Sequence, residues 1–297
     1  MNLNKLSLRD FRNYVNLELE FEPGVGFSYS NVNYTLLSYV VEQVSGVSYE
    51  DFIRKNIFEP LGMIHSDFLN EVKANPHWGL SYDRLLPGSW LGDLLQGCGD
   101  IVGDEMERFG VHLWLAPALN IHRSIRCGRN FEYFSEDPLL TGKMAAAQLK
   151  GMQRWGTTGT IKHFAANNKE VNRFYSDSRI SERALREIYL RGFEICVRKS
   201  QPHTIMSSYN IINGRRCCES YEQMQGILRD EWGFQGMVTT DWSVPCDQAE
   251  CVKVGNDARM PDGKPQDIRK GLEEGRIQRG HLELCAKRIL EMILKLD

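Results

Sequence analysis

Apolar and polar residues follow a repeating order from about residue 89 to the C-terminus. Short apolar runs alternate with long segments in which apolar residues recur at three- and four-residue steps. The runs predict strands at 112–115, 158–163, 204–208, 237–240 and 252–256. The long segments predict helices at 91–109, 139–155, 181–199, 221–232 and 281–296. Strands separated by such helices pair in parallel, so the pattern predicts an α/β fold with five units of a TIM (β/α)8-type barrel.

The first 88 residues carry a different pattern. Residues 17–21 alternate with period two, which predicts a half-buried strand, and Pro23-Gly24 marks a turn after it. Residues 33–44 predict a helix, and a second helix begins at Ser48 and ends near 60–62. Residues 75–88 contain two prolines and two glycines and predict a loop. We therefore expect a short α/β N-terminal extension before an incomplete or rebuilt barrel.

Composition and charge narrow the choice of partners. The chain has 36 Lys+Arg against 39 Asp+Glu, a net charge of −3, so no basic field draws it onto nucleic acid or anionic lipid. No window approaches the roughly 18 consecutive apolar residues of a membrane span, and charge interrupts the apolar residues at the start. We expect a cytoplasmic protein without a nucleic-acid or membrane partner, and its oligomeric state stays open.

Eight cysteines are spread over the chain without a Cys-x-x-Cys pair and without Cys/His spacing of the zinc type. In a chain of this length that opens without an export signal, such cysteines are expected to be free thiols in a reducing compartment. The sequence therefore predicts no disulfides, no metal site and no cofactor.

Polar residues follow the predicted strands at the point where each strand ends. They are Asn120, Arg123 and Arg129 after the first run, Lys162 and His163 at the end of the second, Tyr209 and Asn210 after the third, and Asp241 and Trp242 after the fourth. The carboxyl ends of parallel strands meet at one edge or barrel mouth, so four loops are expected to converge there.

Each of these residues also has a structural interpretation. Asp241 suits a helix N-cap, Lys162 and His163 suit a surface pair, and Tyr209 suits a turn with a buried ring. Their shared position at successive strand ends favours a site instead. One carboxylate, several cationic donors and an aromatic ring together suit the hydroxyl groups and the flat face of a sugar.

Seven stretches from residue 110 onward carry a resemblance to a known family. They are GVHLWLAPALNIHRS (110–124), GRNFEYFSEDP (128–138), IKHFAANN (161–168), DSRISERALREIYLRGFE (177–194), MSSYNIING (206–214), LRDEWGFQGMVTTDW (228–242) and GND (255–257). In this order, the part of the chain at 89–297 resembles the barrel domain of glycoside hydrolase family 3, of the β-glucosidase type.

The resemblance implies a retaining glycosidase that acts on a small carbohydrate or β-glucoside. Asp241 matches the family's nucleophile, which attacks the anomeric carbon and forms a covalent glycosyl-enzyme that water then hydrolyses. The residues expected to hold the sugar are Arg129, Lys162, His163 and Tyr209 by the resemblance, with Trp242 beside the nucleophile.

Two family features are missing from the pattern. A proton donor is needed about 5–5.5 Å from the nucleophile, and in β-glucosidase-type members it lies in a second domain, whereas this sequence stops at Asp297. In single-domain members an Asp-Ser-His loop supplies it, but here Arg179 follows Asp177-Ser178, and a guanidinium gives up no proton at usable pH. The family's Asp-Gly-Pro loop also does not occur. We therefore expect impaired hydrolysis, with an inactive sugar-binding or scaffold barrel as the alternative.

The N-terminal part resembles two other families. The stretches FSYSNVNYTLLSYVVEQVSG (27–46) and NIFEPLGM (56–63) resemble a serine β-lactamase-like or penicillin-binding hydrolase, without its Ser-x-x-Lys nucleophile or Lys-Thr-Gly element. The stretch LSLRDFRNYVNLELEFEPGV (6–25) resembles the opening strands of a RecF-type ATPase, without its phosphate loop. The expected organisation is a mosaic of 1–25, 26–88 and 89–297, in which 17–21 takes the place of a barrel strand beside 112–115.

Overall fold

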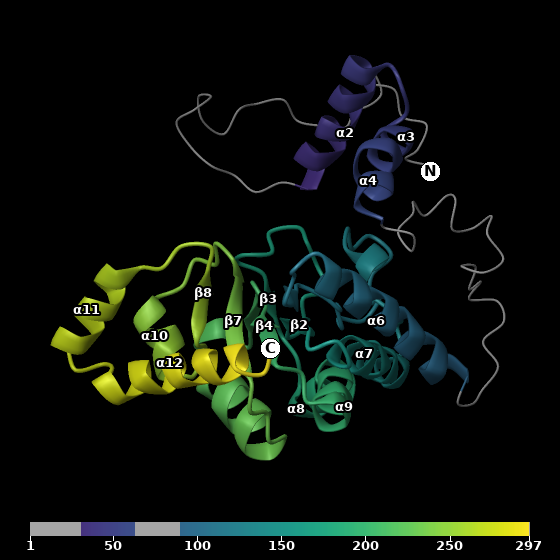
Figure 1. Cartoon of the computed structure of the whole chain (residues 1–297). Coiled ribbons are helices and arrows are strands. Elements are labelled where there is room, and N and C mark those ends of the chain that lie inside the picture. The colour runs from purple at the N-terminus through teal and green to yellow at the C-terminus, as the bar shows by residue number, and fades with distance from the viewer. Residues whose placement is uncertain (1–30, 63–89, 297) are drawn as a thin grey trace. The chain divides into compact units, whose positions relative to one another are not determined.

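A computed structural model describes residues 31–62 and 90–296, and the chain divides into two compact units, Met1–Gly79 and Leu80–Asp297 (Figure 1). In the first unit, α2 spans Asn31–Ser45. The Ser48 side chain accepts a hydrogen bond from the Asp51 N–H at 3.0 Å and caps α3 (Tyr49–Ile53). A π-helical turn, η2 (Arg54–Phe58), leads into α4 (Glu59–Leu61). Both predicted helices are confirmed, whereas 17–21 and 75–88 lie outside the described residues.

The second unit is built on a parallel sheet. Its strands lie in the order β1 (Leu113–Trp114), β2 (Thr158–Phe164), β4 (Thr204–Ser207), β7 (Met237–Trp242) and β8 (Ala258–Met260), and every neighbouring pair is parallel. Four of these strands fall on predicted runs. Because chain order and sheet order agree, the unit has the arrangement of a TIM-like barrel that is incomplete within the described residues.

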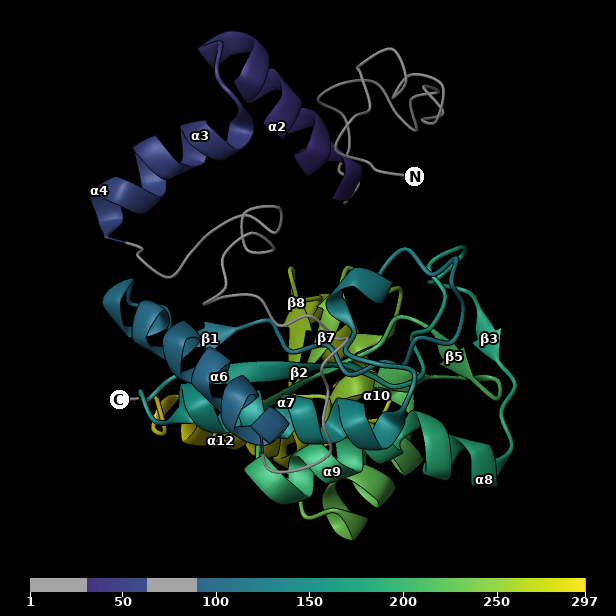
Figure 2. The same ribbon diagram turned by 90° about the vertical axis from the view of Figure 1, so that its right-hand side faces the viewer.

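Helices cover the sheet, and their order follows the predicted rhythm. They are α6 (Trp90–Arg108), α7 (Pro138–Gln153), α8 (Glu182–Ala184) with η5 (Leu185–Tyr189) and α9 (Arg191–Ser200), η7 (Glu222–Glu231) and α12 (Arg279–Ile293). Helix α7 packs between α6 and α9 and against β2 (Figure 2). The strands β2 and β4 are buried along almost their whole length, as expected for a parallel sheet covered by helices. None of the helices described here is long and apolar enough to cross a membrane.

The prediction of a strand at 252–256 is wrong. Its first residues end the short helix α10 (Gln248–Lys253), which Asp247 caps by accepting a hydrogen bond from the Ala249 N–H at 2.8 Å. Gly255, with φ at +83°, then turns the chain into β8. A second helix, α11 (Pro265–Glu273), follows β8 and was not expected from the sequence. The alternation of apolar residues at 252–254 belongs to the last turn of a helix.

A small second sheet lies beside the carboxyl ends of the main strands. Its strands are β3 (Asp177–Ser178), β5 (Ile211–Ile212) and β6 (Arg215–Arg216). The β5–β6 hairpin turns through Asn213 and Gly214, whose φ angles are +50° and +86°. An Asn-Gly pair favours this two-residue turn because both positions need positive φ. The hairpin leads into η6 (Cys217–Glu219).

A buried ion cluster joins the sheet to two helices. The Asp257 carboxylate, whose side chain is fully buried, accepts hydrogen bonds from Arg229 of η7 at 2.8 Å and Arg288 of α12 at 3.1 Å. It also accepts the Val238 N–H of β7 at 2.8 Å. The cluster therefore fixes η7 and α12 against the strand that ends at Asp241.

Candidate active site

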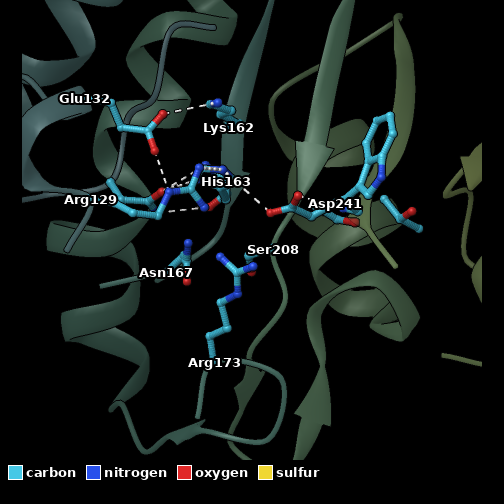
Figure 3. Close-up of polar contacts among 12 residues, drawn as sticks. Arg129, Glu132, Lys162, His163, Asn167, Arg173, Ser208 and Asp241 are labelled. Atoms are coloured by element: carbon cyan, nitrogen blue, oxygen red, sulfur yellow. Dashed lines mark hydrogen bonds and ion pairs between the residues drawn. The ribbon is translucent and has the colours of Figure 1, made fainter. Parts of the chain in front are cut away.

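The carboxyl ends of three neighbouring strands bring the predicted site residues together (Figure 3). Lys162 and His163 lie at the end of β2, Tyr209 follows β4, and Asp241 lies at the end of β7. Arg129 comes from the loop after β1, immediately before the 3₁₀ turn η4 (Asn130–Glu132). Parallel pairing of β2, β4 and β7 places these ends at one edge of the sheet.

Asp241 is buried, and one of its oxygens has no hydrogen-bond partner. Oδ1 accepts the Trp242 N–H at 2.7 Å, whereas Oδ2 lies 3.6 Å from His163 Nε2 and receives no hydrogen bond. The N-cap of the following helix is Asp247 and not Asp241, so the capping interpretation fails. A buried carboxylate oxygen without a donor is an unusual arrangement, because buried polar atoms are normally paired.

Burial sets the ionisation of Asp241. The loss of solvation raises the pKa of its carboxyl above the ordinary aspartate value, although the Trp242 N–H, Arg129, Tyr209 and Arg173 all act in the opposite direction. A raised pKa makes the ionised form more basic and a better nucleophile, provided that the pH lies above it.

His163 is neutral and has a defined tautomer. Arg129 Nη2 donates to its Nε2 at 2.6 Å, so the ring proton lies on Nδ1 and is donated to Asn120 Oδ1 at 3.1 Å. Asn120 also binds the His163 backbone N–H and C=O. Burial, followed by the charges of Arg129, Lys162 and Arg173, holds the pKa of His163 well below its usual value. The contact with Asp241 is therefore not an ion pair.

Glu132 links two of the sugar-binding candidates. Its Oε1 accepts the Arg129 Nε–H, and its Oε2 lies 3.1 Å from Lys162 Nζ (Figure 3). All three side chains are at most one-fifth exposed. Glu132 thus holds both cations toward the site and compensates part of their charge. It was not identified from the sequence, although it lies in the stretch 128–138.

Tyr209 and Arg173 form a stacked pair under the site. The Arg173 guanidinium lies 4.4 Å from the centre of the Tyr209 ring, and Glu170 holds Arg173 at 2.9 Å. Burial, and then the charge of Asp241, raises the pKa of the Tyr209 phenol. Arg173 points toward Ser208 and Asp241 (Figure 3). The sequence gave no signal for Arg173, because it comes from an irregular loop after β2.

Three predicted residues lie elsewhere. Arg123 donates to the Tyr189 hydroxyl and lines a separate cavity of about 540 Å³, so the expectation that it joins the site is wrong. Asn210 is buried and donates to the Ala165 C=O at 3.3 Å, which is a structural role. Arg179 is mostly exposed and pairs with Asp177 at 2.9 Å on the rim of the same cavity.

Trp242 is half-buried beside Asp241, to which its backbone N–H is bonded. Arg129, Lys162, His163, Tyr209 and Asp241 share one site with it, as described above. The class of molecule defined by this sheet edge is a TIM-like α/β protein with a buried carboxylate among basic and phenolic groups.

The family follows from comparison with known proteins. Residues 84–292 match the family described as "Glycosyl hydrolase family 3 N terminal domain". This chain belongs to glycosyl hydrolase family 3.

Similar proteins of known name extend well beyond the matched region. Beta-glucosidase A of Butyrivibrio fibrisolvens is 47% identical over 199 residues, which are 67% of this chain and 24% of that protein. An exo-alpha-(1->6)-L-arabinopyranosidase of Bifidobacterium longum is 40% identical over 211 residues, 71% of this chain and 28% of that protein. The structure of beta-glucosidase 3B from Thermotoga neapolitana in complex with alpha-D-glucose matches with a TM-score of 0.67 and 44% identity, covering 70% and 30% of the two chains. The chain spans about a quarter of the length of these relatives.

Proposed function

We propose that this chain supplies the nucleophile and the sugar-binding groups of a retaining, β-glucosidase-like active site. The observation that carries the proposal is the buried Asp241 Oδ2, which lies among basic groups and receives no hydrogen bond. Relatives named as β-glucosidases, and one solved with glucose, support a small carbohydrate as the substrate.

The sugar is held by groups that are already positioned. Arg129 and Lys162 present N–H donors that Glu132 fixes in place, and the His163 ring is fixed by Asn120. Such donors bind hydroxyl groups and place positive charge near the reacting centre before the reaction begins. The half-buried Trp242 offers a flat surface for the apolar face of the ring.

The bond-making step then involves one carboxylate oxygen. Asp241 Oδ2 forms a bond to the anomeric carbon, the glycosidic C–O bond breaks, and the leaving oxygen departs with the electron pair. The product is a glycosyl ester of Asp241. The positive charge that develops on the sugar in the transition state is stabilised by the remaining negative charge on the carboxylate.

The departing oxygen needs a proton unless it is a good leaving group. In residues 90–296, the polar groups beside Asp241 are the Trp242 N–H, the His163 ring and the Tyr209 phenol. The His163 proton faces Asn120, and the raised pKa of Tyr209 makes it a poor acid. With these groups alone, the reaction lacks general acid catalysis, which is worth about 10²- to 10⁴-fold.

The experiment uses a leaving group that needs no proton. Mixed with a nitrophenyl β-glucoside, the chain is expected to release up to one equivalent of nitrophenol in a burst and to carry one glycosyl group at Asp241, detected by mass spectrometry. The burst rate is expected to fall as the pH drops through the pKa of Asp241. Because burial raises that pKa, the fall occurs above the value of about 3.9 for a free aspartate.

Three results would contradict the proposal: no burst, an adduct at another residue, or a rate that stays constant to below pH 4. The second candidate, a sugar-binding module without turnover, is favoured by the lack of an acid beside Asp241. It predicts heat of glucose binding in calorimetry without any burst.

A positioning role for Glu132 gives a separate prediction. Glu132→Gln keeps the shape of the side chain but removes the charge that Arg129 and Lys162 share. Glucose binding is expected to weaken about tenfold, which corresponds to about 1.4 kcal/mol, because both cations lose their fixed orientation. Glu136→Gln, an exposed change in the same loop, is the control and is expected to bind glucose normally. Equal affinities for the two variants would refute the role.

A further inference from the structure

Three cysteine sulfurs converge behind the nucleophile. Cys218 lies in η6, Cys251 lies in α10, and Cys246 lies in the segment between β7 and α10. Their Sγ atoms are all within 4.8 Å of one another, and all three residues are buried. The sequence analysis missed this group because zinc motifs are recognised by short spacing, whereas these thiols come together only through the fold.

The convergence is selective. Cys217 is the chain neighbour of Cys218 and equally buried, but its sulfur faces the Ala165 C=O at 3.7 Å. Cys196 and Cys285 bond to groups of their own or a neighbouring helix. A disulfide requires two sulfurs, and a third at the same point has no part in it, whereas three sulfurs are a common donor set for a metal.

The spacing of the sulfurs suits such an ion. Zn–S bonds of about 2.3 Å in tetrahedral geometry place sulfurs about 3.8 Å apart. The observed upper bound of 4.8 Å therefore closes to a bound geometry with small side-chain shifts. Tyr209 and Val244 pack with the three cysteines in one apolar cluster, which shields the sulfurs from water.

Charge compensation favours a dication. Three thiolates and one dication leave a net charge of −1, and the Arg259 guanidinium lies beside them, with Nη1 2.7 Å from Cys246 Sγ. The Val244 C=O holds the same guanidinium at 2.8 Å. Hydrogen bonds from Cys218 and Cys251, together with Arg259, lower the pKa of the Cys246 thiol. The whole assembly is neutral, which a buried site requires.

We propose that Cys218, Cys246 and Cys251 bind one zinc-group dication through three thiolates, with Arg259 balancing the remaining negative charge. Three protein ligands leave a fourth position for a water or a small exogenous ligand. The ion joins the segment after Asp241 to η6 and α10. This inference does not depend on the glycosidase proposal, because it concerns different side chains and a different readout.

The test is metal binding by the full chain, reduced and kept anaerobic. Titration with Co²⁺ is expected to give thiolate-to-cobalt charge-transfer absorption that saturates at one equivalent and disappears when Zn²⁺ is added. X-ray absorption of the zinc-loaded chain is expected to show three sulfurs at about 2.3 Å. Cys246→Ser and Cys251→Ser are expected to lose at least about tenfold in affinity.

Cys217→Ser is the matched control and is expected to bind cobalt like the unsubstituted chain. Where a serine variant does not fold, as judged by circular dichroism, the X-ray absorption result on the unsubstituted chain decides. Fewer than three sulfur neighbours, an equal loss in Cys217→Ser and Cys246→Ser, or a disulfide between two of the three cysteines in the anaerobically purified chain would each overturn the proposal.

Discussion

Asp241→Asn is expected to form no glycosyl adduct and to release no burst of nitrophenol. The amide keeps the size of the side chain and still accepts the Trp242 N–H, so the sheet edge stays intact. It has no negative charge and is a poor nucleophile. Removing an enzyme nucleophile costs on the order of 10⁴-fold or more in rate, so adduct formation should drop below detection in rapid-quench mass spectrometry.

Asp177→Asn is the matched control for this experiment. Asp177 is a partly buried carboxylate of the neighbouring small sheet, paired with Arg179, and it does not contact Asp241. Its variant is expected to show the same burst as the unsubstituted chain. An adduct in Asp241→Asn would disprove the assignment of the nucleophile, and a burst lost in Asp177→Asn would point to a proton donor on that loop.

Asp257→Ala is expected to destabilise the fold by about 3–5 kcal/mol, because it leaves two buried guanidinium groups without their counter-charge. Arg229 and Arg288 both bond to this carboxylate, and their side chains are 6% and 11% exposed. Burial raises the pKa of Asp257 and lowers the pKa of Arg229 to about 10, so the ionised pair already carries a solvation cost. Breaking it is nevertheless worse than keeping it. Urea denaturation measures the change in unfolding free energy.

Glu187→Ala provides the comparison for stability. Glu187 also bonds to an arginine, Arg183, but both side chains are exposed. Exposed pairs of this kind contribute about 0–1 kcal/mol. If the two variants unfold at similar urea concentrations, the cluster around Asp257 does not fix η7 and α12 to the sheet.

The sequence predicts the main sheet because each buried strand is a compact apolar run followed by a long helix. The run at 158–163 gives β2, and the run at 237–240 gives most of β7. The pattern fails at 252–256, because α10 is too short to show a helical period and its last turn alternates like a strand. The hairpin at Asn213-Gly214 has a clear turn signal that was not used.

The candidate site is predictable where strand position alone decides it. Asp241 and Lys162 are brought together by parallel pairing, which the sequence rhythm already implies. Glu132 and Arg173 escape prediction because their roles depend on how irregular loops aim side chains. The same holds for the three cysteines, whose segments are far apart in the chain. The predicted strand at 17–21 and its pairing with 112–115 stay a prediction, since 17–21 lies outside the described residues.

The locked imidazole of His163 has a practical consequence for kinetics. Most hydrolases that contain an active-site histidine show an inflection near neutrality, but this ring stays uncharged across that range. Between weakly acidic and weakly alkaline conditions, only the nucleophile changes its protonation among the groups around it. An alkaline limb in a rate profile would therefore report an acid contributed from outside this set, which makes a simple titration of velocity an assay for any additional domain or partner that completes the machinery.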